Sequence, residues 1–272
     1  MIIDNDKVVA LLRQVAADEV MPLWQNLGKD DISYKAGDEP VTVADKASEV
    51  ALTAALTGLL PGSKVVGEEA VADDPAVMDL LKGEEWVWVV DPIDGTRNFS
   101  LGNKNFALMV ALVRQGQSEA AWIYAPAIDS LACGARGEGV VLDGKAVLIS
   151  DNPAAPAALR GTLHAGQFSP REMARRISKR RDRVAAQRSM GSAGIEYLRL
   201  LAGGLDFSFF TKLMPWDHAP GCLLLEVAGA VARFTDTHEA YSPRRHAGEG
   251  LLLAPDPDAW ARLHQTLLAD PV

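Results

Sequence analysis

The sequence predicts a mixed α+β or α/β protein built in layers. Helical and strand patterns occur together along the chain, short apolar runs between residues 106 and 142 are separated by Gly, Pro or Asp, and the pattern changes after a linker at 151–158. With 272 residues, 48% of them hydrophobic, the chain can bury a large core. We therefore expect an N-terminal α+β half (1–150) and a C-terminal α/β half (151–272) in one compact functional unit.

The N-terminal segment predicts two helices. Apolar residues at near-helical spacing predict an amphipathic helix over 8–24. Residues 35–45 are expected to form a loop with a short extended exit, followed by a helix over 46–60 that a Pro-Gly pair closes. A brief strand over 64–70 runs into two glutamates, Glu68 and Glu69.

Strand-forming residues dominate the next segment. Residues 85–90, EWVWVV, are rich in β-formers and give the strongest strand prediction in the chain. The apolar runs that follow predict an antiparallel meander. They cover 106–114, 119–125, 131–135 and 139–142.

The second half predicts alternating helices and strands. Ser169 to Glu172 form a capping box with Pro170 at the first helical position, so a helix is expected to start there. The other predicted elements are strands at 183–190, 205–210, 231–235 and 250–254, and helices at 194–204, at 218–230 launched from Asp217, and at 257–268.

Composition restricts the partners and the compartment. The 27 basic and 36 acidic residues give a net charge of −9, which argues against binding to nucleic acid or to an anionic membrane. The most basic segment, 171–183, is interpreted as the exposed face of a surface helix. No apolar stretch approaches the ~20 residues that span a bilayer. Two scattered cysteines, Cys133 and Cys222, and an acidic N-terminus without signal-peptide character predict a soluble cytoplasmic protein.

Acidic residues stand at the end of an apolar run or at the start of a helix in several places. They are Asp45, Glu68 with Glu69, Asp91 with Asp94, and Asp217. Taken singly, each has a structural explanation. An aspartate at the N-cap, as at Asp45 or Asp217, stabilises a helix by ~1 kcal/mol, and paired glutamates are common in exposed turns.

Asp91 and Asp94 are harder to explain as parts of a turn. Asp91 directly follows a strand that should be buried, and a carboxylate there without a partner costs several kcal/mol. No lysine lies within the motif, and a hard dication such as Mg²⁺ prefers carboxylate and carbonyl oxygens. Gly95 and Thr96 follow at once. A helix starting there would offer unpaired N–H groups to an anion, and the threonine hydroxyl can position a water.

At these residues the sequence resembles the inositol monophosphatase family of metal-dependent, lithium-sensitive phosphatases. The resemblance covers roughly residues 7 to 265 and is carried by DPIDGTRNF (91–99), PWDHAPG (215–221), VTVAD (41–45), GEE (67–69) and GEGVVLDGKAVLIS (137–150). It implies an αβαβα layered sandwich of the sugar-phosphatase type, commonly a homodimer. It also implies two to three Mg²⁺ ions, with Mn²⁺ as a possible substitute.

The resemblance assigns roles to matching positions. Metal ligands would be Glu68, Asp91 and the carbonyl of Ile93 for the first ion, and Asp91, Asp94 and Asp217 for the second, with Glu68 also touching a weaker third ion. Thr96 with Asp45 would activate the attacking water, and Lys35 corresponds to a loop lysine near the metals. Substrate would be held by Asp94, by the N–H groups of Gly95 and Thr96, and by Gly191, Ser192 and Ala193, which match a stretch lining the substrate ring.

One departure from the family concerns the substrate. Seven residues before Asp217, enzymes for inositol phosphates carry a glutamate that binds ring hydroxyls, whereas this sequence has Phe210, followed two residues later by Lys212. Neither side chain accepts hydrogen bonds from a polyol as a glutamate does. His218 either contacts substrate or packs, and packing is the commoner role for a buried histidine.

The sequence therefore predicts Mg²⁺-dependent hydrolysis of a small phosphate monoester by a metal-activated water. The expected partner is a small phosphorylated metabolite such as inositol 1-phosphate or a related sugar or polyol phosphate. Alternatives are histidinol phosphate, a nucleoside 3′,5′-bisphosphate or fructose bisphosphate. A catalytically silent regulatory protein with the same fold is the non-enzymatic alternative. Zinc is disfavoured because no His/Cys cluster accompanies the acids.

Overall fold

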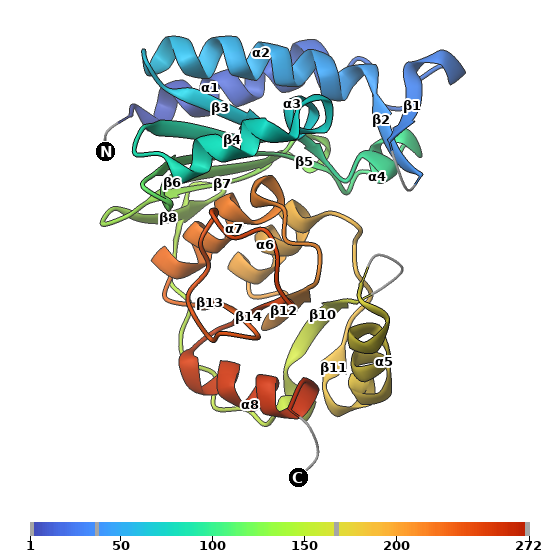
Figure 1. Cartoon of the computed structure of the whole chain (residues 1–272), viewed down its shortest axis with the longest axis vertical. Helices are drawn as coiled ribbons and strands as arrows, with labels where there is room; N and C mark the ends of the chain where they lie inside the picture. The colour runs from blue at the N-terminus through green and yellow to red at the C-terminus, as the bar shows by residue number, and fades with distance from the viewer. Residues whose placement is uncertain (1–2, 36–37, 166–168, 270–272) are drawn as a thin grey trace.

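The computed structural model describes residues 3–35, 38–165 and 169–269, and its elements are stacked in five layers. From top to bottom in Figure 1, a pair of helices covers a large sheet, a second helix pair lies beneath it, and a smaller sheet and further helices follow. The predicted αβαβα sandwich is thus confirmed. The helices are α1 (Asn5–Val15), α2 (Val43–Leu59), α3 (Glu68–Asp73), α4 (Thr96–Ser100), α5 (Arg171–Arg180), α6 (Ala193–Leu201), α7 (Pro215–Val227) and α8 (Pro257–Leu267).

The upper sheet contains the predicted meander. Its strands run in the order β3-β4-β5-β6-β7-β8-β9, in which β3 pairs parallel with β4 and every later pair is antiparallel. The bounds are β3 (Lys64–Gly67), β4 (Trp86–Asp94), β5 (Ala107–Arg114), β6 (Gln117–Ala125), β7 (Ser130–Ala135), β8 (Gly139–Leu142) and β9 (Lys145–Val147). The last strand was not predicted, because its three residues carry almost no pattern.

The lower sheet is mixed. Its order is β11-β10-β12-β14-β13, with β10 parallel to both neighbours and the remaining pairs antiparallel. Its strands are β10 (Arg160–His164), β11 (Ala185–Ala186), β12 (Phe207–Phe210), β13 (Val231–Phe234) and β14 (Leu251–Ala254). The strand predicted over 183–190 is reduced to two residues, and β10 was missed because its RGTLH sequence lacks alternation.

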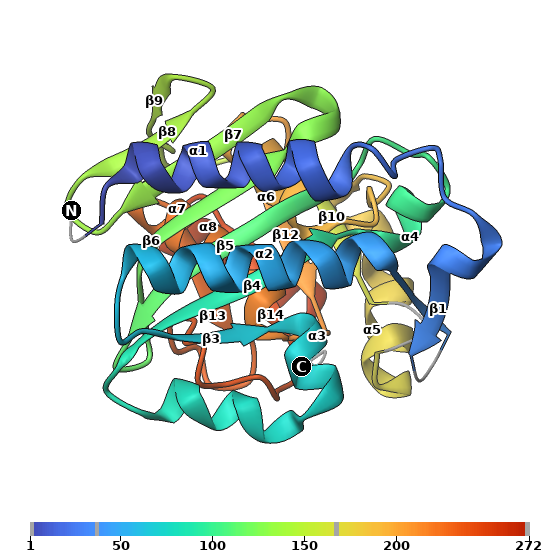
Figure 2. The ribbon, with the colours of Figure 1, turned by 90° about the horizontal axis from the view of Figure 1, so that it is seen from above.

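Among the described residues, three clusters of buried hydrophobic side chains hold the layers together. Successive residues of β4 face opposite ways, so Trp88 and Val90 pack under α1 and α2 while Val87 and Val89 pack against the middle helices. Figure 2 shows α1 and α2 lying side by side across the strands. Below, α5 and α8 pack on the outer face of the lower sheet.

The middle helices are apolar around most of their surface. All but one of the residues from Pro215 to Leu225 of α7 are buried, and one core cluster joins this helix to strands of both sheets. A helix that is buried all round is expected between two sheets. The layer formed by α6 and α7 therefore belongs to the core of both halves.

Several predicted helix starts are wrong. Thr42, not Asp45, is the N-cap of α2, and Asp45 occupies the third helical position, where its carboxylate accepts a bond from the Thr42 N–H. Likewise α7 begins at Pro215 after Met214, so Asp217 lies inside its first turn. In both cases a residue outside the acidic pattern starts the helix.

The predicted capping box at Ser169 is also absent. Helix α5 begins at Arg171 after Pro170 with no side-chain cap, while the Ser169 hydroxyl lies 2.5 Å from the Thr211 hydroxyl. A tertiary partner replaces the local one. The opening α-helix is shorter than predicted, because α1 ends at Val15. A π-helical turn over Ala16–Val20 follows it.

A short hairpin takes the place of the predicted loop over 35–45. It pairs β1 (Ile32–Lys35) with β2 (Glu39–Thr42), and residues 36–37 lie outside the described part. The helix expected after Gly95 is present as α4. Within the described residues, no helix combines the length and the apolar character that crossing a membrane requires.

Candidate active site

Three aspartates from distant parts of the chain converge below the upper sheet. Asp91 and Asp94 end β4, and Asp217 lies in the first turn of α7. One carboxylate oxygen from each lies within 4.8 Å of the others. Glu68 and the Ile93 segment line the same cavity, of about 210 Å³. The structure thus brings together the predicted metal ligands, although among the described residues the tight group contains only the three aspartates.

Asp91 is the member that lacks a protein partner. Its side chain is 1% exposed, and its Oδ1 atom accepts no hydrogen bond from any described residue. Burial raises the pKa of Asp91 well above its ordinary value, and the nearby Glu68 charge raises it further. A buried carboxylate oxygen without a donor is expensive, and a cation among three carboxylates removes that cost. The residues present therefore fit a hard divalent metal ion.

Asp94 is held in place by the start of α6. One of its oxygens accepts from the Ser192 hydroxyl and from the Gly194 N–H at 2.7 Å, and the other accepts from the Ala193 N–H at 3.1 Å. Burial raises the pKa of Asp94, and these donors oppose that shift. Ser192 and Ala193, predicted to line the substrate, therefore fix a predicted metal ligand in this structure.

Asp217 lies near the positive charge of Lys212, which follows β12 of the lower sheet. Burial raises its pKa to about 8, while the positive charge of Lys212 opposes the shift. Lys212 Nζ lies 2.9 Å from Glu39 Oε1 on the β1–β2 hairpin. No local sequence pattern points to either residue as part of the metal site, because a lysine–glutamate pair separated by so much chain leaves no local signal.

The raised pKa values predict an unusual pH dependence of stability. An aspartate whose pKa is higher in the folded than in the unfolded chain penalises folding once the pH exceeds its unfolded value. For Asp217 the window runs from the ordinary 3.8 to about 8, and for Asp45 from 3.8 to about 7. We expect the thermal midpoint of the chelator-treated protein to fall as pH rises through this window, and Mg²⁺ to reverse the fall. A midpoint that rose with pH in chelator would contradict the assignment.

Glu68 occupies the first position of α3 and is engaged by Lys35. The ammonium of Lys35 lies 3.0 Å from Glu68 and 2.7 Å from Glu69. Burial lowers the pKa of Lys35, but the Glu68 charge and its partners outweigh burial and raise it. Glu49, from the middle of α2, accepts from the N–H groups of Glu69 and Ala70, both at 2.8 Å. Glu49 therefore fixes the first turn of α3. Its role cannot be predicted from the sequence, where Glu49 is one polar residue among others in a helix.

Thr96 and Asp45 are in direct contact. The Thr96 hydroxyl lies 2.9 Å from Asp45 Oδ1 and 3.0 Å from the carbonyl oxygen of Ile93. The other oxygen of Asp45 accepts from the Thr42 hydroxyl at 2.6 Å and from the Thr42 N–H at 2.8 Å. Burial raises the pKa of Asp45 to about 7. The pair has the geometry of a hydroxyl oriented by a carboxylate.

Gly95 allows the chain to turn between the strand and α4. Its φ is +90°, and a Cβ there would lie 2.9 Å from the Asn105 carbonyl oxygen. Asn98 closes the other side: its side-chain amide donates to the carbonyls of Asn105 and Met190, at 2.7 and 2.8 Å. These contacts hold Gly191 at the edge of the acidic cavity, and its role in substrate binding stays a prediction.

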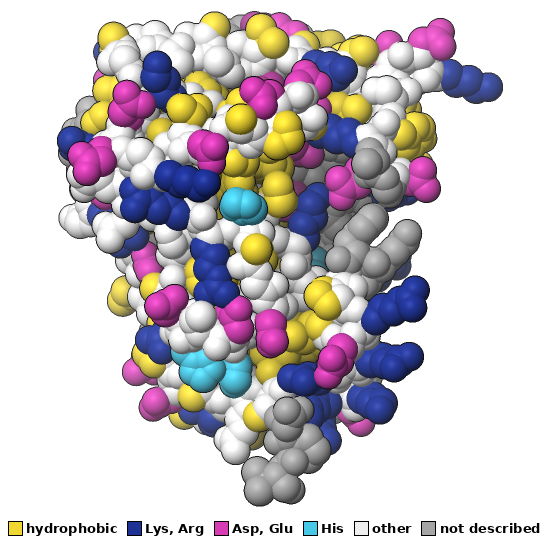
Figure 3. All heavy atoms as spheres, in the orientation of Figure 1, with side chains coloured by type: hydrophobic (Ala, Val, Ile, Leu, Met, Phe, Trp, Pro, Cys, Tyr) yellow, Lys and Arg dark blue, Asp and Glu magenta, His cyan; other side chains and the backbone are white. Residues whose placement is uncertain are grey.

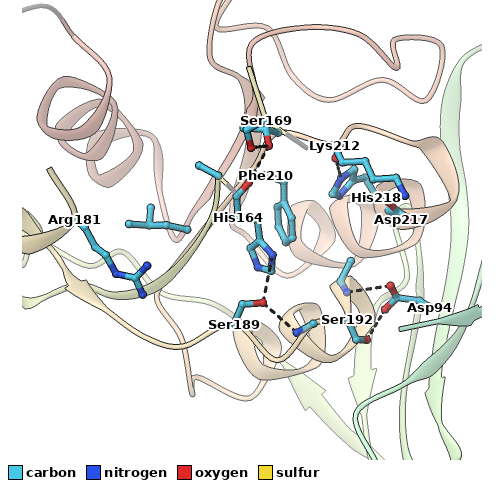
Figure 4. A pocket seen from close by; sticks show the side chains of 15 residues that line it. Asp94, His164, Ser169, Arg181, Ser189, Ser192, Phe210, Lys212, Asp217 and His218 are labelled. Atoms are coloured by element: carbon cyan, nitrogen blue, oxygen red, sulfur yellow. Dashed lines mark hydrogen bonds between the residues drawn. The ribbon is translucent and has the colours of Figure 1, made fainter. Parts of the chain in front are cut away.

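A larger cavity adjoins the acidic one. Its volume is about 540 Å³, and its lining includes four residues that also line the smaller cavity: Asp94, Gly191, Lys212 and Asp217. Figure 4 shows its central wall, where the rings of His164 and Phe210 stack at 4.3 Å. Clefts of this size are typical of small-molecule sites.

His218 lines this cavity but has both ring nitrogens engaged. Nε2 lies 2.7 Å from the Lys212 carbonyl and must donate to it, so Nδ1 accepts from the Tyr197 hydroxyl at 2.9 Å. Burial lowers the pKa of His218 to about 4, which keeps the ring neutral. The ring therefore supports the wall of the cavity.

Buried carboxylates at the junction of two cavities are an arrangement suited to an enzyme that holds metal ions and a small anionic substrate. Comparison with known proteins defines the class as that of the phosphoric monoester hydrolases. The chain belongs to the inositol monophosphatase family, whose sequence model matches residues 4–270. The resemblance stated from the motifs is confirmed.

Individual relatives are similar over most of their length. An inositol-1-monophosphatase from Rhizobium meliloti is 32% identical over 209 residues, which cover 75% of this chain and 74% of that protein. A fructose-1,6-bisphosphatase/inositol-1-monophosphatase from Aquifex aeolicus is 29% identical over 235 residues, 82% of this chain and 83% of that protein. The crystal structure of extragenic suppressor protein SuhB from Bartonella henselae superposes with a TM-score of 0.80 at 21% identity, covering 98% of both chains, and shows the shared fold.

Proposed function

We propose that the protein hydrolyses a small phosphate monoester with Mg²⁺ held by Glu68, Asp91, the Ile93 carbonyl, Asp94 and Asp217. The observation that carries this proposal is the buried, unpartnered oxygen of Asp91 beside two further aspartates. Membership of the inositol monophosphatase family leads us to expect two or three ions, with Mn²⁺ as a possible substitute. When bound, the ions would neutralise phosphoryl charge and lower the pKa of a ligated water.

The side chains around the acids perform the remaining tasks. The Thr96 hydroxyl donates to Asp45, which leaves its lone pairs able to accept a hydrogen bond from the attacking water. The proton of that water would pass through Thr96 to Asp45 Oδ1, which already accepts from the Thr96 hydroxyl at 2.9 Å. Lys35 keeps Glu68 oriented. We expect the N–H groups of Gly95 and Thr96, two residues that line the smaller cavity, to hold the phosphate.

The departing alcohol occupies the 540 Å³ cavity, next to Gly191, Ser192 and Ala193. Its candidates are an inositol-1-phosphate-like compound or another sugar or polyol phosphate, histidinol phosphate, a nucleoside 3′,5′-bisphosphate and fructose bisphosphate. The last is supported by the name of the Aquifex aeolicus relative. We further propose that the protein works in the cytoplasm, as a homodimer, on free metabolites.

Phosphate release from a substrate panel tests the proposal. With Mg²⁺ present we expect release from at least one of inositol 1-phosphate, histidinol phosphate, fructose 1,6-bisphosphate and 3′-phosphoadenosine 5′-phosphate. Chelator should abolish release and added Mg²⁺ should restore it, because the cluster binds no substrate without its cations. Lithium at millimolar concentration should inhibit.

A silent regulatory protein is the competing function. It predicts no phosphate release from any compound with Mg²⁺ or Mn²⁺ present, although calorimetry still detects binding of the metal. The intact set of acids, with Thr96 hydrogen-bonded to Asp45, favours the enzyme.

A further inference from the structure

The basic segment 171–183 reaches the substrate cavity. It forms α5 and the following 3-10 turn over Arg181–Arg183, and its first residue, Arg181, lines the 540 Å³ cavity. In Figure 4, Arg181 and the pair Asp94 and Asp217 lie on opposite sides of the His164–Phe210 stack. The cavity therefore runs from the acidic cluster at one end to a guanidinium at the other.

The charge of Arg181 is not neutralised by a carboxylate. Within the described part of the chain its guanidinium forms no ion pair, and its one hydrogen bond is a 3.5 Å contact with the Gln187 carbonyl. By contrast, Arg160 and Arg199, also near this sheet, each pair with an acid, Asp206 or Glu196. Arg181 thus keeps donors available for a ligand.

Other groups near Arg181 suit an anion. The Ser189 hydroxyl, which lines the cavity, accepts from the Gly191 N–H at 3.1 Å and lies 3.4 Å from His164 Nδ1, so it shares its hydrogen bonds with a second polar group of the same wall. The buried Glu196 beneath is occupied, since it accepts from the Met190 N–H at 2.8 Å and pairs with Arg199 at 3.4 Å. At this end the cavity offers donors, whereas binding a neutral polyol also requires acceptors.

The surface outside the cavity has the same sign. Arg171, Arg175 and Lys179 are exposed on α5, and Figure 3 shows basic side chains gathered on this side of the molecule. On a chain of net charge −9 such a concentration attracts anions locally.

We propose that the alcohol released by this enzyme carries a second anionic group, a phosphate or a carboxylate, which Arg181 binds at the end of the cavity remote from the acids. The inference rests on the proposed phosphatase function and adds the substrate class. Lys212 lines both cavities but lies beside Asp217 at the acidic end, where its ammonium pairs with Glu39 at 2.9 Å, so it leaves the remote end to Arg181. Arg181 acts as a specificity-determining residue because a guanidinium binds planar or tetrahedral oxyanions through two donors.

Matched substrate pairs and a matched variant test this proposal. The pairs are fructose 1,6-bisphosphate with fructose 1-phosphate, 3′-phosphoadenosine 5′-phosphate with 3′-AMP, and 6-phosphogluconate with glucitol 6-phosphate. The first two pairs test a second phosphate and the third tests a carboxylate. Arg181→Gln is compared with Arg183→Gln, since Arg183 lies in the same exposed turn but does not line the cavity.

The wild type should prefer the doubly anionic member of at least one pair by about tenfold in kcat/KM, the size expected of one charge-assisted interaction. Arg181→Gln should remove that preference mainly through KM and leave the singly anionic member within about twofold. Arg183→Gln should behave as wild type. Equal turnover of both members by the wild type, or equal losses in the two variants, overturns the inference while leaving the phosphatase intact. No turnover of any compound overturns both proposals.

Discussion

Replacing Asp91 with asparagine is expected to abolish phosphate release and, at the same time, to stabilise the metal-free protein. The carboxylate has an oxygen without a described donor and a pKa raised by burial, so removing its charge relieves an unfavourable burial. The gain should be on the order of 1–3 kcal/mol in chelator, the cost of an unsatisfied buried group. Turnover should fall at least about a thousandfold, because a carboxamide does not replace a charged metal ligand.

Two measurements on the same variant separate metal binding from a folding defect. Phosphate release is followed with Mg²⁺, and the thermal midpoint is measured in chelator and in Mg²⁺. The variant should have the higher midpoint in chelator and should lose the increase that Mg²⁺ gives the wild type. Asp79→Asn, at an exposed ion pair, is the control and should change neither quantity. A variant with full activity, or with a lower midpoint in chelator, refutes the metal site.

Gly221→Ala is expected to destabilise the protein strongly, because the added methyl group has no room between α6 and α7. A Cβ at Gly221 would lie 2.1 Å from the ring of Tyr197, whose side chain is fully buried between α6 and α7. Overpacking of this kind costs about 3 kcal/mol. For a chain of this length that corresponds to a fall of roughly 6–12 °C in the thermal midpoint.

The effect should extend to activity well below the midpoint. Tyr197 donates to His218, and α7 carries Asp217, so separating the two helices displaces the wall of the cavity and one acid together. Gly58→Ala is the control, because nothing lies within 4 Å of a Cβ there and the site is helical. It should stabilise by about 0.5–1 kcal/mol. Equal midpoints for the two variants would show that α6 and α7 are not tightly packed.

The sequence predicts those parts of the molecule that carry a local pattern. The meander follows from runs of β-formers separated by turn residues, and the acids at the ends of those runs drew attention because a buried strand ending in Asp91 and Asp94 is costly. The structure confirms the meander and places the two aspartates with Asp217 in one cluster. The assignment of individual catalytic and metal-binding roles stays a prediction.

Other features depend on partners far away in the chain. Glu49 caps a helix 20 residues later, and Lys212 pairs with a glutamate 173 residues before it. No window of sequence contains both members of either pair. The predicted capping box at Ser169 is absent for the same reason, since the Ser169 hydroxyl forms a hydrogen bond with the Thr211 hydroxyl instead of the local backbone. Tertiary contacts outweighed local propensity at each of these positions.

Under the proposed function, the layered arrangement separates the residues of the reaction from those that select the substrate. Asp91 and Asp94 lie at the end of β4 in the upper sheet. His164 and Phe210 end strands of the lower sheet, and Arg181 lies in the turn after α5. Ligand preference can thus diverge through exchanges at β10 and the turn after α5 while the reactive centre stays untouched. A chimera that receives residues 160–190 from a relative should inherit the donor's choice of alcohol and retain its own metal requirement.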